Sequence, residues 1–433
     1  MNRTHKLNML IAAVLLVTLL FTIYGRRDAP NVSQSPPAAT SVSSAPVKIT
    51  FWNVETNDLR QALLNQSIQA FNQTHKAIQI VPYFYEVETY KAKLKLSMIS
   101  GKMPDLFYYW TGESFKYMVD SQIIADLTEK MQEKPAFMKQ FYPEALQYAT
   151  YYDRLYGLPH TTSHVVFWYN KRIFAQYGIT PPQTWDELMS AAQQLLNNGI
   201  PPFTVSGKER WPLLNWFAYL SNRMGGSTPF QHAIKKTGDF TDPAFLEGAQ
   251  LFRGLITAKM FVPGFLGLDG PKAEDILLKG EAAMYLQGDW VAEKMLSNPD
   301  IGYFRFPTVH GKGDPQVYYG GYSSGWAISA NSNRDAAFEV LSSMFSMEER
   351  KKVVEASGLL STVKVMPLDR NNMNPLVYDF VTFIEKDPVD FFGYYDQEID
   401  PHRSQLLLNA VVTMASAPTM SQEEIEDLLK QIR

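Results

Sequence analysis

The chain reads Tyr156-Gly-Leu-Pro-His-Thr-Thr-Ser-His-Val-Val-Phe-Trp-Tyr-Asn-Lys-Arg-Ile-Phe174 and then Pro181-Pro-Gln-Thr-Trp-Asp-Glu-Leu188. This stretch decides the fold. Its residues from Val165 to Tyr169 are all apolar or aromatic, which is typical of a strand covered on both faces. The stretch therefore predicts a buried strand, followed by a loop and a helix.

The loop and the helix have their own signals. Pro181 and Pro182 cannot continue a helix and rigidify the turn. Thr184 and Glu187 have the spacing of a capping box, so their side chains can bond free amides at a helix start. Gly199 favours a left-handed stop. The helix between these signals has a predicted buried stripe of Leu188, Ala191, Leu195 and Leu196.

The chain before this stretch alternates between strand and helix patterns. The predicted order is a strand from 47 to 52, a helix from 58 to 72, a strand from 77 to 85, a helix from 89 to 100 and a strand from 104 to 110. This order predicts an α/β fold with a mostly parallel sheet and helices on both faces. In such sheets ligands bind beyond the carboxyl ends of the strands.

Aromatic residues stand at two of these strand ends. Trp52 and Asn53 close the first strand, and Tyr109 and Trp110 close the third. Each aromatic ring has an alternative place in the core. Two pairs at the same sheet edge nevertheless favour a ligand site there.

Composition narrows the class of protein. The chain has 433 residues, a net charge of −4 and 45% hydrophobic residues. Its length predicts two or three domain-sized units, and its charge distribution shows no nucleic-acid footprint. Cysteine is absent, which excludes disulfides, thiolate metal sites and a cysteine nucleophile.

The N-terminus predicts a membrane segment. A largely apolar run from Leu7 to Tyr24 follows Arg3 and Lys6, and it is longer than a usual signal-peptide core. We expect residues 1–27 to be a signal anchor, with a cleaved signal peptide as the alternative. Residues 28–46 are rich in Pro, Ser and Ala and predict a disordered tether.

Several motifs resemble those of one protein family. They are the stretch from Tyr156, the turn Gly101-Lys-Met-Pro-Asp105, the segment Leu278-Lys-Gly-Glu-Ala-Ala-Met-Tyr-Leu-Gln-Gly-Asp-Trp290 and the segment from Gly320 to Ser329. In kind and order they resemble bacterial extracellular solute-binding protein family 1, the maltose-binding-protein-like sugar receptors of ABC importers. Lipid-anchored members of this family carry a cysteine as the lipid attachment point, and this chain lacks it.

The resemblance implies a two-lobed periplasmic-binding-protein-like (type II) fold with hinge crossings. The first lobe would comprise residues 47–160 and about 320–360, and the second 161–319 and about 361–433. It implies a monomeric extracellular receptor that delivers an oligosaccharide to an ABC transporter permease, without cofactor or metal. Two alternatives stay open, namely a sugar-sensing accessory of a membrane sensor kinase and a secreted glycan-active enzyme.

The candidate contacts follow from the resemblance and from sugar chemistry. Aromatic faces cover the C–H side of a sugar ring, and planar polar groups bond its hydroxyls. Trp290 and Asp289 match best, since the family motif places its tryptophan in the cleft; the alternative for Trp290 is a place in the core. The other candidates are Trp110, Tyr109, Glu113, Asn53, Glu55, Arg210, Trp211, Tyr322, Ser323, Tyr395 and Asp396.

Enzymatic interpretations find less support. His160 and His164 are four residues apart, but no glutamate motif accompanies them and they lie outside a predicted helix. Glu398 and Asp400 could pair as acid and base, as any chain rich in acidic residues allows. Neither a P-loop nor a dinucleotide fingerprint is present. We therefore expect no enzyme.

Overall fold

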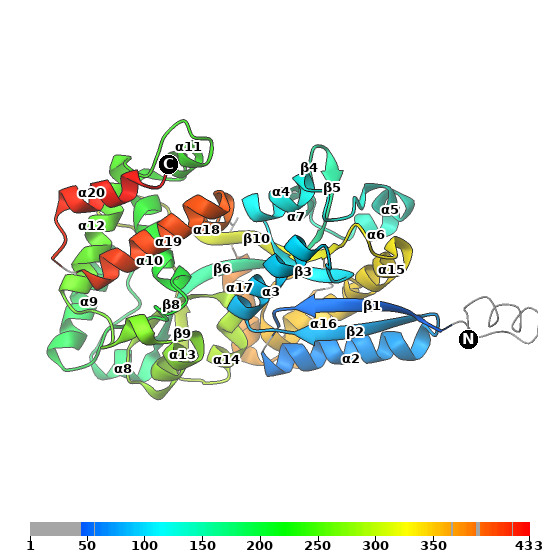
Figure 1. Ribbon diagram of the computed structural model, residues 1–433. Coiled ribbons are helices and arrows are strands. Elements are labelled where there is room, and N and C mark those ends of the chain that lie inside the picture. Colours follow the sequence, from blue (N-terminus) through cyan, green and yellow to red (C-terminus); the bar gives the residue numbers. More distant parts are fainter. Residues whose placement is uncertain (1–44, 56, 365–366, 387–389, 418) are drawn as a thin grey trace, which may run out of the picture. The chain divides into compact units, whose positions relative to one another are not determined.

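The computed structural model (Figure 1) describes residues 45–55, 57–364, 367–386, 390–417 and 419–433. The expected signal anchor, residues 1–27, and nearly all of the expected tether, residues 28–46, lie outside these ranges. Among the described residues, no helix is long and apolar enough to cross a membrane. The compact unit discussed below runs from Pro46 to Arg433.

A mixed sheet forms the centre of this unit. Its strands are ordered β2-β1-β3-β10-β6-β8-β7, with β11 beside β10 and β9 beside β6, and β4 and β5 form a separate pair. The strands are β1 Val47–Asn53, β2 Ile78–Phe84, β3 Leu106–Trp110, β4 Thr150–Tyr151, β5 Arg154–Leu155, β6 Leu158–Asn170, β7 Phe203–Thr204, β8 Met284–Gly288, β9 Ile301–Phe304, β10 Val317–Ile328 and β11 Asp390–Phe392.

Helices cover the sheet (Figure 1). Those before β8 are α2 Asp58–Thr74, α3 Val87–Ser100, α4 Glu113–Asp120, α5 Thr128–Glu133, α6 Pro135–Met138, α7 Pro143–Gln147, α8 Lys171–Gln176, α9 Trp185–Asn197, α10 Trp211–Gly225, α11 Thr228–Ile234, α12 Pro243–Thr257, η1 Phe265–Gly267 and α13 Gly270–Lys279. Those after it are η2 Asp289–Val291, α14 Ala292–Leu296, α15 Arg334–Met344, α16 Met347–Ser357, η3 Arg370–Asn372, α17 Pro375–Glu385, α18 Tyr395–Glu398, α19 Pro401–Ser416 and α20 Gln422–Lys430.

The predicted local elements are confirmed. The five elements expected between residues 47 and 110 are present as β1, α2, β2, α3 and β3. The run from Val165 to Tyr169 lies in β6, and its first four residues have no exposed surface. Helix α9 begins with the expected capping box of Thr184 and Glu187, and Gly199 has the left-handed φ of +76°.

The strand directions correct one expectation. Strand β1 pairs in parallel with β2 and β3, as predicted. Strand β10, however, is antiparallel to both β3 and β6, and β6 is antiparallel to β8. The sheet is therefore mixed rather than mostly parallel. The reason is that two long strands, β6 and β10, run past each other in opposite directions through its middle.

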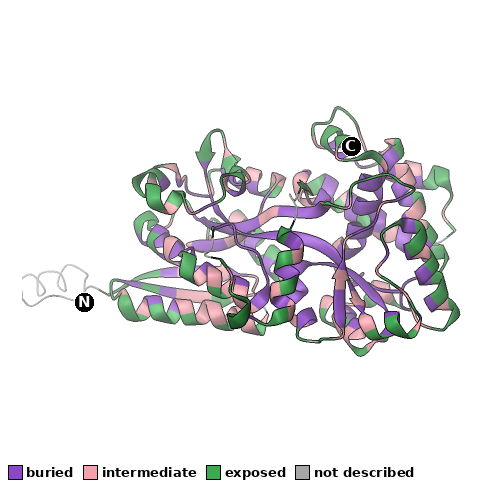
Figure 2. Ribbon diagram, turned by 180° about the vertical axis from the view of Figure 1, so that it is seen from behind, coloured by how far each residue is buried: buried purple, intermediate pink, exposed green. Residues whose placement is uncertain are grey.

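The buried residues form three clusters along these long strands, and we treat the two that lie on opposite faces of β6 and β8 as one group. The group that we call the first core is built on β1, β3 and the end of β10, with α15 packed against them. The group that we call the second core is built on both faces of β6 and β8, with α10, α12, α17 and α19. The central strands β6, β8 and β10 are mostly buried, whereas the edge strand β2 and the outer faces of the helices are partly exposed (Figure 2).

Candidate ligand-binding site

A cavity of about 910 Å³ lies between the first and second cores. Asn53 and Trp110 line it from the first core, at the carboxyl ends of β1 and β3. These ends meet at one edge because β1 and β3 are adjacent in the sheet and parallel to each other. Trp211 and Trp290 line the cavity from the second core, just after the turns that lead into α10 and out of β8.

Seven of the thirteen sequence candidates line this cavity. They come from both cores and are spread between positions 53 and 396, so the fold brings together residues that are far apart in the sequence. The seven are Asn53, Glu55, Trp110, Trp211, Trp290, Ser323 and Asp396. Their contact with a ligand stays a prediction.

The Trp290 indole forms an aromatic wall on the second-core side. Its ring lies 5.7 Å from the Trp211 ring at 64° and 6.4 Å from the Tyr394 ring. It folds back over Gly288, where an added Cβ would come within 2.0 Å of the ring. The glycine of the sequence motif is thus required so that this indole can lie against the strand end.

The Trp110 indole stands on the opposite side. Its ring packs edge-on against Tyr108 at 4.8 Å and Tyr90 at 5.8 Å. The ammonium group of Lys91 lies 5.3 Å from the ring centroid. Trp110 and Lys91 both line the cavity, so this wall combines an aromatic plane with a positive charge.

Two tyrosine candidates are core residues. Tyr109 is fully buried and its ring stacks on Phe115 at 3.9 Å. The physical reason is strand alternation, since neighbours of Trp110 on β3 must point to the other face; Tyr108 lines the cavity instead. Tyr395 is buried in the second core, where its ring stacks on Phe230 at 3.7 Å.

Three polar candidates also lie outside the cavity lining. Asp289 has no exposed surface, and its Oδ2 lies 2.7 Å from Nδ1 of the buried His164. Arg210 instead donates to side-chain oxygens of Asn409 and Gln405 on α19. Glu113 lies near Glu398, and burial together with the Glu113 charge raises the pKa of Glu398 to about 7.

Tyr322 is the sixth candidate outside the lining. Its ring packs 5.5 Å from Tyr148 and 6.1 Å from Phe391. The neighbouring Ser323 reaches the cavity and lies 3.1 Å from the Ser163 hydroxyl. The crossing strands therefore place one of the two adjacent candidates at the cavity and the other in a cluster of aromatic rings.

His160 has a hydrogen-bonding role that was not predicted from the sequence. Its Nδ1 lies 3.2 Å from the Ser324 carbonyl, which can only accept, so Nδ1 carries the proton. Burial and the Arg350 charge lower the pKa of His160 to about 3, so the ring is neutral. Its Nε2 is therefore an acceptor, and the residue lines the cavity.

Two further charged residues at the cavity were also missed. Glu209 accepts from the Gly270 amide through Oε1, while its buried Oε2 has no partner among the described residues; burial raises its pKa. Arg350 is 4% exposed and lies over the rings of Trp326 and Phe345. Burial lowers its pKa to about 10. Adjacency to the predicted Arg210 and Trp211 was the only sequence signal for Glu209.

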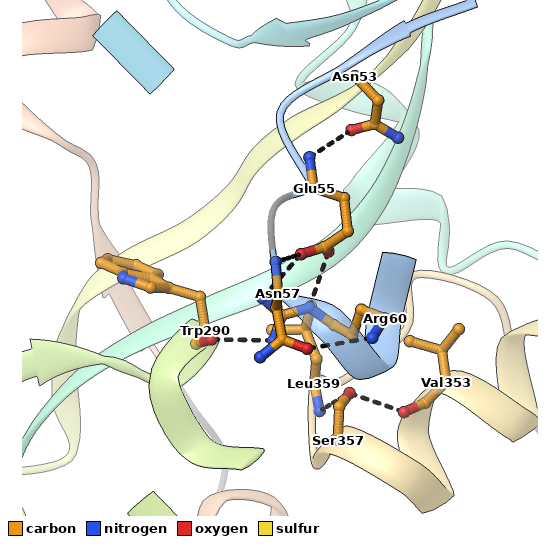
Figure 3. A network of polar contacts seen from close by, with 8 residues as sticks. All are labelled: Asn53, Glu55, Asn57, Arg60, Trp290, Val353, Ser357 and Leu359. Carbon is orange, nitrogen blue, oxygen red and sulfur yellow. Dashed lines mark hydrogen bonds and ion pairs between the residues drawn. The ribbon is translucent and has the colours of Figure 1, made fainter. Parts of the chain in front are cut away.

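Arg60 is another cavity residue that was not predicted from the sequence. It lies in the first turn of α2 and pairs with the predicted Glu55, with Nε 2.7 Å from Oε2 (Figure 3). Both residues line the cavity. No motif in the sequence singled out this residue.

The chemistry of the lining suits an uncharged polar ligand with apolar faces. The indoles of Trp110, Trp211 and Trp290 provide planes, and imidazole, carboxylate, hydroxyl and positively charged groups provide hydrogen bonds around them. Within the described part of the chain, no group of three or more His, Cys, Asp or Glu could hold a metal ion. His160 and His164 do not meet, because His164 pairs with Asp289 in the core.

Comparison with known proteins identifies relatives. The chain is 28% identical over 227 residues to an uncharacterized ABC transporter extracellular-binding protein of Pyrococcus horikoshii, which covers half of each protein. The chain thus spans about half the length of that relative. It is 20% identical over 413 residues, 90% of each chain, to the melibiose/raffinose/stachyose-binding protein of Bacillus subtilis.

A solved structure shares the fold. It comes from work on xylan utilization by the thermophilic bacterium Caldanaerobius polysaccharolyticus and superimposes with a TM-score of 0.84. The match covers 89% of this chain and all of that one, at 25% identity. Residues 56–351 also match the family model of the bacterial extracellular solute-binding proteins. Because that match takes in well over half of the chain, this protein belongs to the bacterial extracellular solute-binding protein family.

Proposed function

We propose that this protein is the receptor of an ABC importer and binds an oligosaccharide in the cavity between the first and second cores. The observation that carries the proposal is that Trp110 and Trp290 line one cavity from opposite cores. A sugar ring has two apolar faces, and two separate indole planes can each cover one ring of a chain of sugars.

The polar lining supports the same ligand class. Glu209 and Asp396 supply carboxylate acceptors, His160 supplies a neutral acceptor and Asn53 supplies both kinds of group. Burial raises the pKa of the Asp396 carboxyl, which marks a site removed from water. A sugar hydroxyl loses its water on binding and needs such partners.

The relatives support the ligand and the partner. The Bacillus subtilis relative is named for binding melibiose, raffinose and stachyose, and the Pyrococcus relative is named as part of an ABC transporter. We infer a di- to oligosaccharide ligand, delivery to a membrane permease, a monomeric receptor and no catalysis. We place it on the extracytoplasmic side, held by the N-terminal segment of residues 1–27.

The two cores also support the proposed lobes. The first core draws on residues 49–158 and 326–345 with Val363, and the second on residues 165–319 and 373–432 with Val354 and Leu360. We propose that these are the lobes 47–160 with about 320–360 and 161–319 with about 361–433. Closure would occur at β6 and β10, the strands that both cores share.

Truncation of Trp290 tests the proposal. A thermal-shift screen of the chain from residue 46 against a glycan panel identifies a ligand. Trp290→Ala should then weaken its binding, measured by calorimetry, at least about tenfold, because lost stacking and lost area together exceed about 1.4 kcal/mol. The exposed Tyr117→Ala serves as a control with unchanged affinity.

Two results would contradict the proposal. One is a Trp290→Ala protein that folds and binds every glycan as well as the wild type does. The other is chemical turnover, since a receptor returns its ligand unchanged after long incubation. Chromatography of the recovered ligand measures the second.

A further inference from the structure

Arg60 makes a contact that joins the two cores. Its guanidinium binds Glu55 twice, through Nε to Oε2 at 2.7 Å and Nη2 to Oε1 at 3.1 Å. Its Nη1 donates to the main-chain carbonyl of Trp290 at 2.9 Å. Figure 3 shows this chain of bonds between α2 and the segment after β8.

The bonded groups belong to different parts of the fold. Glu55 and Arg60 lie at the end of β1 and in α2, whose buried residues Ile68 and Phe71 belong to the first core. Trp290 packs against the second core. The bond from Arg60 therefore spans 230 positions of sequence and the cavity edge between the cores.

The ion pair of Glu55 and Arg60 leaves Nη1 of Arg60 free to donate to Trp290. The Glu55 carboxylate takes a two-pronged grip on the guanidinium, which fixes its plane and balances its charge. Asn57 caps α2 by accepting from the Arg60 amide, and the Glu55 carboxylate accepts from the Asn57 amide. Glu55 and Asn57, which precede Arg60 in the chain, thus fix its position, and its side chain is only 11% exposed.

A second contact lies beside the first. The Glu293 carboxylate, three residues after Trp290, interacts with the Asn57 side chain and with the Arg60 charge. Burial is the largest influence on this carboxyl and raises its pKa. The start of α14 and the start of α2 therefore meet at Arg60, next to the cavity.

We propose that Arg60 is a positioning residue that clasps the Trp290 main chain and thereby favours the closed arrangement of the two lobes, with or without a ligand. The inference rests on the proposed function and goes beyond it, because it assigns a residue of one lobe to the placement of the stacking plane of the other. In an open protein Arg60 would keep both bonds to Glu55 and lose only the bond to Trp290. The clasp thus links lobe closure to the position of the Trp290 indole.

Removal of the clasp needs a charge-balanced variant. Arg60→Gln alone leaves the partly buried Glu55 carboxylate without its partner, which would destabilise the fold for an unrelated reason. The double variant Glu55→Gln with Arg60→Gln removes the clasp and both charges. Arg60→Lys keeps the charge but loses the fork, and Arg154→Gln, which breaks a pair that is 63% exposed on its arginine side, is the control.

The first readout is binding of the glycan identified with the wild type. A charge-assisted bond of this kind corresponds to about tenfold or more in affinity, and its loss should increase the dissociation rate constant. We expect the double variant and Arg60→Lys to bind at least about tenfold more weakly, and Arg154→Gln to bind like the wild type. Melting temperatures without ligand should differ little between the double variant and the control.

The second readout needs no ligand. Because the chain has no cysteine, Leu96→Cys on α3 and Arg172→Cys on α8, both exposed, give two unique spin-label sites, one on each side. The distance distribution should shift to longer distances in the double variant. If the wild type binds no glycan, the proposed function fails while this measurement still tests the clasp. Unchanged distances in a folded double variant, or unchanged affinity where a ligand exists, would overturn it.

Discussion

Gly288→Ala should move the Trp290 indole without touching the ligand directly. A Cβ at Gly288 would lie 2.0, 2.2 and 2.3 Å from three atoms of the ring, whereas ordinary contact begins at 3.4 Å. The indole must therefore shift by more than 1 Å. The backbone itself accepts alanine, because Gly288 has a φ of −71°.

The size of the effect follows from the stacking energy. A displaced plane loses up to the whole stacking term, about 0.5–1.5 kcal/mol, which corresponds to a roughly 2- to 13-fold loss of affinity. Calorimetric titration with the identified glycan measures it. Gly254→Ala is the matched control, since a Cβ there meets nothing within 4 Å, and it should leave the affinity unchanged.

A double-mutant cycle tests the cause. In a Trp290→Ala background the added methyl group of Gly288→Ala meets no ring, so the second substitution should change the affinity very little. If Gly288→Ala weakens binding as much without the indole as with it, the loss comes from the β8 strand end. That result would refute the role given to the ring.

Two further changes concern carboxyl groups. The fold raises the pKa of Glu398 from 4.5 to about 7, so the stability that this carboxyl contributes is complete below pH 4.5 and is lost as the pH rises through 7. The melting temperature of the wild type should therefore fall across this range, and Glu398→Gln should make that fall smaller. Parallel melting curves against pH for both proteins would contradict this prediction. The buried Oε2 of Glu209 has no partner among the described residues and is available to a sugar hydroxyl. Glu209→Gln should therefore weaken glycan binding about tenfold without lowering the melting temperature. Unchanged affinity in calorimetry would argue against a contact between Glu209 and the glycan.

The local elements could be predicted because their signals are local. The spacing of Thr184 and Glu187 alone defined the start of α9, and the left-handed Gly101 ended α3 where expected. The apolar run from Val165 to Tyr169 identified a strand buried on both faces. Strand direction was harder to predict from the sequence, because the antiparallel pairing of β6 with β10 joins residues more than 150 positions apart.

The candidate site was predictable where a motif or a strand end marked it. Asn53 and Trp110 close adjacent parallel strands and line the cavity. The prediction of Tyr109 could have been avoided from strand periodicity. Neighbouring residues on a strand point to opposite faces, so Tyr109 and Trp110 cannot both face the cavity. Asp289 shows another kind of limit. Its carboxylate looked available beside Trp290, but its partner His164 lies on a different strand and holds it in the core.

Arg60 shows why contacts across a cavity escape a sequence pattern. Periodicity reports which face of a helix is apolar, and α2 has only Ile68 and Phe71 fully buried, so its charged residues look solvated. The position of Arg60 in the first turn of the helix that follows β1 was informative nonetheless. In a sheet of this kind the first turn of the helix that follows a strand lies at the ligand edge, and a guanidinium there can reach the opposite side of the cavity. The bond from Arg60 to the Trp290 carbonyl follows from that placement, so charged residues in the first turn after each parallel strand belong among the candidates for such sites.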